Sequence, residues 1–429
     1  MAASLCYVNP DFFRDSLEPH TNKPQFCALA TLRLNIHKIR KTQSSTRKSA
    51  LIRQIRFIHV SIIPATYLRF MEKTFSYDQL LTFSKNIFLK IGCSEADAST
   101  ASKALISADL RGVDSHGVAR LSGYVRLWEV NRVNSQPLLK IIHETPSTAV
   151  VDGDSGLGLV VAPFAMQVAI DKAKNVGSGW VSVQNSNHFG IAGYHAMMAL
   201  PYDMIGIAMT NASALVAPTF STQRMLGTNP IAVAIPAGKE QPFVADFATT
   251  TASNGKLEIL QRKYQPAPEG WVQTKKGETT TNANALKEGG AMLPLGGDRE
   301  HGSHKGYMLG SIVDIFSGIL SGANYGPWVP PFPSYVPMPE NMPGKGIGHF
   351  FGTMRIDAFR TAEDFKANMD QWIQEFKKAA TIEGEEKVII PGEPEREMEK
   401  ERMQHGITLF DSVIADLKTL GERFSIEFP

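Results

Sequence analysis

Five short apolar runs, separated by helical or glycine-rich stretches, constrain the fold of this chain most strongly. Each has the length and the β-branched or aromatic content of a buried strand. They occupy residues 148–151, 180–184, 204–209, 230–235 and 243–247. The clearest helix among them covers residues 162–176, and residues 349–356 have the pattern of another strand. This mixture of strands and helices predicts a sheet domain of the α/β or α+β class over residues 146–360.

Helical signals precede the strand-rich region. Ser76 and Gln79 form a capping box ahead of apolar residues at helical spacing. Two further helical stretches follow before residue 130, so we predict a helical domain over residues 71–145. The chain ends in more helical sequence, residues 361–429, which we expect to pack back on this domain.

Composition limits the class of protein. At 429 residues the chain is long enough for two domains, and its 20% charged and 43% hydrophobic residues are typical of globular proteins. The three cysteines, Cys6, Cys27 and Cys93, are too few and too scattered for a disulfide framework or a thiolate metal site. Cysteine usage therefore favours a reducing compartment, and we expect a cytoplasmic protein.

Residues 1–70 differ in charge from the rest of the chain. They hold eleven Lys and Arg residues against three acidic ones, whereas the remainder holds 33 against 39. This composition is typical of an organelle transit peptide or a nucleic-acid-binding arm. A third interpretation is that the stretch is not natural protein, because Met71 begins a segment that resembles a fresh N-terminus. We favour a basic extension that is disordered or non-native.

Neither a nucleic acid nor a membrane is expected as a partner of that extension. It lacks the aromatic residues interleaved on a folded platform that single-stranded nucleic acids require. Its apolar stretch, residues 57–68, is too short to span a bilayer.

The segment from Asp114 to Arg120 is the strongest candidate for chemistry. It places the His116 imidazole and the Arg120 guanidinium four residues apart, and two such residues share one face of a helix. A proton-transfer group beside a bidentate ligand for a carboxylate suits a 2-hydroxy or 2-keto acid. The ordinary alternative is the start of a surface helix, and this pair alone does not exclude it.

Two polar segments follow predicted strands. Residues 185–190 place His188 and Gly190 at a strand end, where backbone N–H groups face outward. His188 is a candidate to transfer a proton or polarise a ligand, and the alternative is a histidine that caps a turn. Residues 246–251 offer one acid and three hydroxyl groups, which suit a ribose and a pyrophosphate, although helix capping explains them more simply.

Two more loops complete the set of candidates. Residues 294–306 form the densest polar loop, in which glycines allow the backbone to surround an anion while Lys305 supplies charge. Its histidines, His301 and His304, lack the i, i+4 placement of a helical zinc motif, so no metal is expected. Residues 391–395 predict a tight turn after a strand at 388–390.

The common nucleotide signatures are missing. No Gly-x-Gly-x-x-Gly lies between a strand and a helix, since Gly153, Gly156 and Gly158 have the spacing reversed. The chain also lacks a Walker sequence. A nucleotide site in this chain is therefore neither of the Rossmann type nor a P-loop.

Together these segments resemble the malate/L-lactate dehydrogenase family of the non-Rossmann type. Its relatives include ureidoglycolate, sulfolactate and hydroxycarboxylate dehydrogenases. The matching pieces are Asp-Ser-His-Gly-x-x-Arg at 114–120, Asn-His-Phe-Gly at 187–190, Thr-Asn-Pro at 228–230, the Gly-Gly…His-Lys-Gly loop and Pro-Gly-Glu at 391–393. The resemblance spans roughly residues 71–429. It implies an α+β fold, with a discontinuous helical domain and a mixed-sheet, non-Rossmann NAD-binding domain.

The resemblance also implies roles for individual residues. His116 would be the acid/base and Arg120 the ligand of the substrate carboxylate, with His188 and Ser115 at the reaction centre. The residues implied to hold the dinucleotide, besides His116, are Gly190, Ile191, Ala192, Asp246, Phe247, Ala248, Thr249, Thr250, His304, Lys305, Gly392 and Glu393.

The implied function is hydride transfer between a nicotinamide cofactor and a small 2-hydroxy or 2-keto acid, such as malate or lactate, in a homodimer. We expect NAD rather than NADP, because a carboxylate at Asp246 would repel a 2′-phosphate. Lys305 and Arg299 are the opposing evidence, since either could neutralise that phosphate. The alternatives are a related reductase acting on ureidoglycolate, sulfolactate, diketogulonate or a cyclic imine, and a metal-dependent hydrolase.

Overall fold

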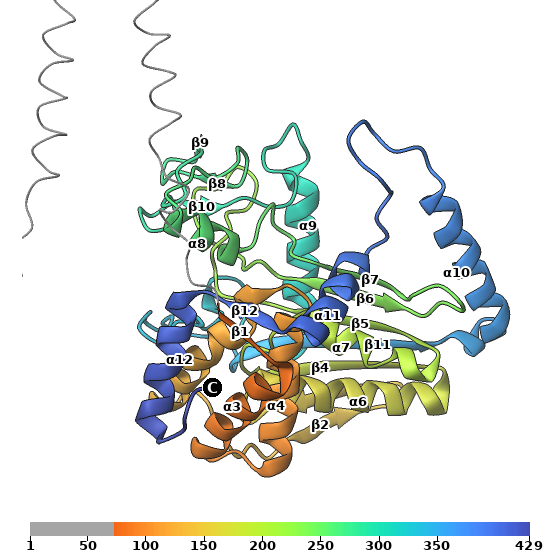
Figure 1. The fold of residues 1–429 in the computed structure, drawn as a ribbon, viewed down its shortest axis with the longest axis horizontal. Helices are drawn as coiled ribbons and strands as arrows, with labels where there is room; N and C mark the ends of the chain where they lie inside the picture. The colour runs from red at the N-terminus through yellow and green to blue at the C-terminus, as the bar shows by residue number, and fades with distance from the viewer. Residues whose placement is uncertain (1–72) are drawn as a thin grey trace, which may run out of the picture. The chain divides into compact units, whose positions relative to one another are not determined.

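The computed structural model describes residues 73–429, and these residues form one compact unit (Figure 1). The predictions for residues 1–70 lie outside the described residues. Among the helices of residues 73–429, none has the length and hydropathy that a membrane span requires.

The central layer is a seven-stranded mixed sheet. Its strands, in spatial order, are β2 (Lys140–Glu144), β3 (Thr148–Asp152), β4 (Ser178–Ser186), β11 (Ile347–Arg355), β5 (Met204–Thr210), β6 (Ile231–Ile235) and β7 (Phe243–Phe247). The β3–β4 pair is parallel and the other neighbouring pairs are antiparallel. The predicted strands are confirmed. The α+β class is confirmed as well, because neighbouring strands are mostly antiparallel, unlike those of the mostly parallel Rossmann sheet.

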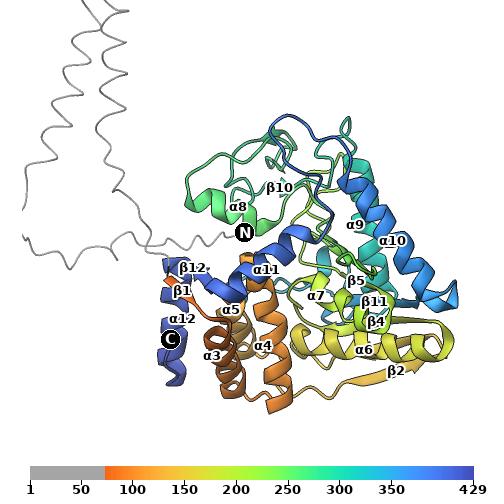
Figure 2. The ribbon, with the colours of Figure 1, turned by 45° about the vertical axis from the view of Figure 1, so that its right-hand side comes forward.

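Helices cover both faces of the sheet. Helix α6 (Gly158–Val176) makes the crossover between β3 and β4, and buries apolar side chains such as Val151, Val181 and Phe351 beneath it. On the opposite face lie α9 (Ser303–Asp314), which contacts β5, and η4 (Ile315–Ile319), which contacts β4 and β11. Figures 1 and 2 show α9 on this side of the sheet. The odd and even positions of β11 therefore face different helices, as strand geometry requires.

A helical layer with its own core lies beside the sheet. It comprises α3 (Tyr77–Lys90), α4 (Glu95–Leu110), α5 (Leu121–Glu129), α11 (Glu393–His405), α12 (Asp411–Phe424) and the two-stranded sheet of β1 (Lys73–Phe75) with β12 (Ile407–Leu409). The capping box of Ser76 and Gln79 is confirmed. Helix α12 packs on α3 and α5, as Figure 2 shows, so this part of the chain returns to the first helices.

Helix α10 (Ala362–Lys377) packs elsewhere. Its Asp370 accepts hydrogen bonds from the backbone N–H groups of residues 238–240, and Trp372 lies edge-on to Phe243 of β7. Residues 362–377 therefore lie beside the β6–β7 hairpin. The division of residues 71–429 into two domains stays a prediction.

A small third core was not predicted. Helix α8 (Asn254–Arg262) covers a three-stranded sheet of β8 (Val272–Gln273), β9 (Thr279–Thr280) and β10 (Ala291–Met292). These strands have two residues each, too few for a periodic signal. The short helices α7 (Ala192–Met197), η3 (Leu200–Tyr202), η5 (Gly326–Trp328) and η6 (Ile356–Ala358) connect larger elements.

The strand predicted at residues 388–390 is wrong, because this stretch is irregular. The carbonyl of Pro391 accepts a hydrogen bond from Val244 of β7. Proline has no N–H group, so it cannot continue the ladder.

Candidate active site

The segment from Asp114 to Arg120 folds as two short 3-10 helices, η1 (Asp114–His116) and η2 (Val118–Arg120). The predicted single helix face for His116 and Arg120 is therefore wrong. Gly117, between the two turns, has φ −89° and ψ −144°, which breaks the helical path. Only glycine fits at this position, because a Cβ atom there would lie 2.1 Å from the carboxyl group of Asp109.

Two other elements hold this turn in place. From the end of α4, the buried Asp109 accepts a hydrogen bond from the Val118 N–H at 2.8 Å. Burial raises the pKa of Asp109 well above its usual range. From α11, Arg402 donates to the carboxylate of Asp114 and to the Asp109 carbonyl. Residues far apart in the sequence thus fix the position of His116.

His116 is a neutral imidazole at pH 7. Burial and, to a smaller extent, the charge of Arg120 lower its pKa to about 4. Its Nδ1 lies 2.9 Å from Ser115 Oγ. When Nδ1–H donates to this oxygen, Nε2 has a free lone pair and can accept a proton.

His188 lies against His116, with ring centroids 5.5 Å apart. The backbone N–H of Gly190 donates to its Nδ1 at 3.3 Å, and the Tyr124 hydroxyl lies 2.7 Å from the same nitrogen. Because an N–H group can only donate, Nδ1 is the unprotonated nitrogen and Nε2 carries the hydrogen. Burial, with smaller effects of His116 and Arg120, keeps the pKa of His188 well below its usual range. His188 is therefore a hydrogen-bond donor, whereas His116 can act as a base.

Arg120 completes the group. Its Nε donates to the Ser115 carbonyl at 2.6 Å, and its Nη2 lies 3.8 Å from the carboxylate of Glu258 on α8. The guanidinium carbon lies 5.8 Å from the centre of the Phe332 ring. The centres of the Phe332 and His188 rings are 4.8 Å apart. Neither Tyr124 nor Phe332 was a predicted site residue, because apolar helix and loop positions look alike in sequence whether or not they border a site.

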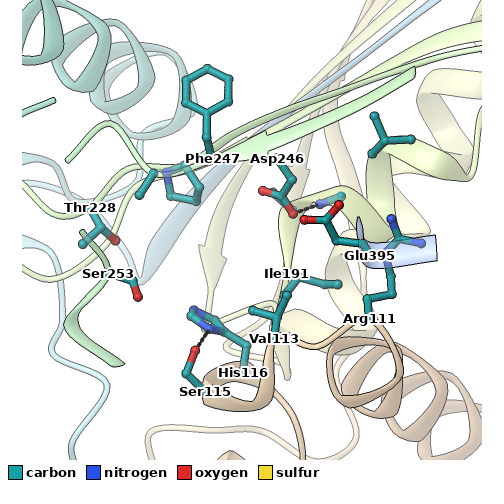
Figure 3. Close-up of a pocket in the computed structure, with 16 residues that line it drawn as sticks. Arg111, Val113, Ser115, His116, Ile191, Thr228, Asp246, Phe247, Ser253 and Glu395 are labelled. Atoms are coloured by element: carbon teal, nitrogen blue, oxygen red, sulfur yellow. Dashed lines mark hydrogen bonds between the residues drawn. The ribbon is translucent and has the colours of Figure 1, made fainter. Parts of the chain in front are cut away.

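Two cavities meet at His116. The Asp246 cavity, about 210 Å³, and the Arg120 cavity, about 370 Å³, share His116, Thr228 and Ser253. The predicted residues that line the Asp246 cavity are Ser115, His116, Gly190, Ile191, Ala192, Asp246, Phe247 and Ala248, and those that line the Arg120 cavity are His116, Arg120 and His188. Figure 3 shows the Asp246 cavity, with His116 and Asp246 on different walls.

The Asp246 carboxylate faces this cavity. Its Oδ2 accepts a hydrogen bond from the Gly193 N–H at 2.7 Å. Burial of the Asp246 carboxyl group raises its pKa to about 6. Glu395 and Arg111 line the same cavity (Figure 3). Arg111 forms an ion pair with Glu399 at 2.9 Å. Glu395 belongs to residues 391–395, for which the sequence predicted only a tight turn, and Arg111, at the end of α4, was not a predicted site residue.

Six residues predicted to bind a dinucleotide lie elsewhere. The hydroxyl groups of Thr249 and Thr250 are buried and donate to backbone carbonyls at 3.1 and 2.6 Å. His304 contacts Arg299 at 3.1 Å, and Lys305 is exposed near the start of α9. The last two, Gly392 and Glu393, begin α11, where Glu393 pairs with Lys387 at 2.9 Å. None of the six lines either cavity as the described residues form it, so their role stays a prediction.

A model of the malate/L-lactate dehydrogenase family matches residues 75–418. The chain belongs to this family. The malate dehydrogenase of Pyrococcus horikoshii is 43% identical over 353 residues, which cover 82% of this chain and 95% of that protein. The L-sulfolactate dehydrogenase of Methanocaldococcus jannaschii is 38% identical over 336 residues, covering 78% and 92% respectively.

The comparison with solved structures gives the same family as the comparison of sequences. The solved structure of malate dehydrogenase from Entamoeba histolytica matches with a TM-score of 0.77 and 34% identity, covering 83% of this chain and 99% of that one. The resemblance inferred from the sequence is confirmed, and the protein is an oxidoreductase of hydroxy acids.

Proposed function

We propose that the protein oxidises a small 2-hydroxy acid, such as malate or lactate, to the corresponding 2-keto acid with NAD. The observation that best supports this proposal is the convergence of His116, His188 and Arg120 on one cavity that continues into a second at His116. A base, a donor and a carboxylate ligand are the groups that this reaction requires.

Each side chain has one task in this proposal. A bound nicotinamide ring supplies the acceptor for the hydride that leaves C2 of the acid. Nε2 of His116 takes the hydroxyl proton and passes it to solvent, so that a keto acid and one proton result. Nε2–H of His188 donates to the oxygen that becomes the keto group, and Arg120 holds the carboxylate.

Substrate binding and basicity are coupled at His116. The positive charge of Arg120 contributes to the low pKa of His116. A carboxylate bound to Arg120 offsets that charge, and so raises the pKa of the neighbouring imidazole. His116 is therefore a better base once the acid is bound.

The Asp246 cavity fits the ribose portion of a nicotinamide cofactor. Asp246 uses Oδ2 for Gly193, which leaves Oδ1 available to accept from a ribose hydroxyl. Asp246 and Glu395 make this wall acidic, which supports NAD over NADP because a 2′-phosphate would be repelled. Lys305 and Arg299, the basic residues that favoured NADP, do not line this cavity as the described residues form it. We propose a non-Rossmann dinucleotide site here.

A substrate panel tests the proposal. The full-length protein is assayed with L-malate and L-lactate, each with NAD and NADP, by the absorbance of the reduced nicotinamide. We expect oxidation with NAD for at least one acid. Reduction of neither cofactor by any acid, in a protein that is folded, would contradict the proposal.

We further propose a cytoplasmic homodimer. Met308, Ile312, Ile315, Ile319 and Leu320 expose an apolar face along α9 and η4, with exposed fractions of 43–58%. A patch of this kind marks an interaction surface in globular proteins. Sedimentation should give a dimer, and Ile315→Lys should shift it towards a monomer. Cysteine usage supports the cytoplasm, because a buried free thiol such as Cys93 persists in a reducing compartment.

A further inference from the structure

A second arginine lines the Arg120 cavity. Arg224 precedes the short bridge of Val216 with Leu226 and lies on the wall of the cavity that also contains Arg120, His116 and His188. Its Nε donates to the Gly290 carbonyl at 2.7 Å, and its Nη2 donates to the Leu286 carbonyl. These two bonds fix the plane of the guanidinium and leave Nη1 without a recorded partner among residues 73–429.

The charge of Arg224 is not compensated. Within the described part of the chain no carboxylate lies within ion-pair distance of it, whereas Arg120 has Glu258 at 3.8 Å. Asn254 donates to the same Glu258 carboxylate at 2.9 Å, so this acid is committed to the Arg120 side of the cavity. Burial lowers the pKa of Arg224, which shows that the protein around it disfavours an unpaired positive charge.

An anion in the cavity would relieve this cost. The volume of about 370 Å³ lies in the range of small-molecule sites and leaves room for an acid longer than three carbons. Arg120 accounts for one carboxylate, beside the two histidines. A guanidinium held by two carbonyls, with an unpaired nitrogen, is suited to bind a second oxyanion.

We propose that Arg224 binds a second anionic group of the substrate, so that the site selects 2-hydroxy acids with two anionic groups over those with one. This inference rests on the proposed function, because it assigns the first carboxylate to Arg120. A carboxylate and a sulfonate share the chemistry that Arg224 would recognise.

The first test uses the full-length protein. We compare kcat/KM for L-malate, L-sulfolactate and L-lactate with NAD. The proposal predicts that malate or sulfolactate is used at least about tenfold better than lactate, since a charge-assisted hydrogen bond is lost with lactate. The malate and sulfolactate arms separate a carboxylate from a sulfonate. Lactate used as well as both dianionic acids would overturn the proposal.

Variants distinguish recognition from structural support. Arg224→Gln should lower the ratio of kcat/KM for the preferred dianionic acid to that for lactate at least about tenfold, and Arg224→Lys should lower it less. Arg126→Gln, which removes the same charge from an exposed position of α5, should leave the ratio unchanged. If Arg224→Gln instead lowers activity equally with all three acids, its role is structural and the proposal is wrong.

A binding experiment separates this inference from the proposed function. Calorimetric titration with oxaloacetate and pyruvate, in the presence of NAD, requires no turnover. Oxaloacetate should bind at least about tenfold more tightly than pyruvate. Absence of turnover contradicts the proposed function, whereas equal binding of the two keto acids contradicts the role of Arg224.

Discussion

The two cavities that meet at His116 have opposite charge. The Asp246 cavity has two carboxylates, Asp246 and Glu395, and its arginine is paired with Glu399 outside the lining. The Arg120 cavity has two arginines, Arg120 and Arg224, and one carboxylate, Glu258. A single histidine lies at the boundary between them.

The difference in charge assigns the cofactor to the Asp246 cavity and the acid substrate to the Arg120 cavity. Ribose hydroxyl groups donate well to carboxylates, whereas an acid substrate is repelled there and attracted to the arginines. The reacting atoms are then brought together at His116, where the cavities join. The charge asymmetry therefore orients the reactants, which is a proximity effect.

Removal of the shared histidine should have the largest effect. His116→Ala should lower kcat by about a hundredfold or more, in line with general acid–base contributions. The KM values for the acid and for NAD should change much less, because neither depends on the proton transfer. Steady-state kinetics measures all three. His301→Ala, in an exposed loop, is the matched control and should keep a normal kcat. A near-normal kcat in His116→Ala would refute the assignment of His116 as the base.

A conservative change in the Arg120 cavity should have the next largest effect. Arg120→Lys keeps the charge but loses the bidentate fork, and should raise the KM for the acid about tenfold. The test compares a hydroxy acid with its carboxamide analogue in the wild type and in the variant. Equal wild-type activity on the two compounds would show that Arg120 does not bind the carboxylate.

A change in the Asp246 cavity should act on the cofactor. Asp246→Asn keeps the shape and the acceptor for Gly193 but removes the charge. We expect the ratio of kcat/KM with NAD to that with NADP to fall several-fold, because less repulsion opposes the 2′-phosphate. Wild type that already favours NADP by tenfold would overturn the cofactor assignment.

The smallest effect should be on the pH dependence of the KM for NAD, which reports on the Asp246 cavity alone. The pKa of Asp246 is raised to about 6, so its carboxylate is charged above that pH and neutral below it. The KM for NAD should therefore rise as the pH falls through about 6. The pKa of His116, about 4, is too low for this group to titrate in that range before substrate binds. Asp246→Asn should remove the rise, and a rise that persists in the variant has another source.

The sequence predicted most of the fold because its signals are local. Strands such as β5 and β6 are nearly continuous apolar runs, and the capping box of Ser76 and Gln79 is complete within four residues. The turn at Gly117 could not be predicted in the same way. The carboxyl group of Asp109, in the preceding helix, leaves no room for a side chain at Gly117 and accepts a hydrogen bond from the Val118 N–H group, and both contacts exist only in the folded chain.

The site was predicted in part for the same reason. His116, His188 and Arg120 lie in short polar motifs, and the structure brings all three to one cavity. Arg224 and Arg111 lie in no such motif, and only tertiary packing places them at the cavities. The prediction for Thr249 and Thr250 as cofactor ligands came from the family resemblance and stays a prediction. A resemblance does not reveal that their hydroxyl groups donate to carbonyls of the protein.

The most direct test of the two-cavity account is one set of KM values, for NAD and for the acid, measured in wild type, Arg120→Lys, Asp246→Asn and the double variant. The account predicts that Arg120→Lys raises the KM for the acid alone and that Asp246→Asn raises the KM for NAD alone. The double variant should show both changes, close to additive in free energy. An Arg120→Lys variant whose KM for NAD rises as much as its KM for the acid would contradict the separation of the two ligands.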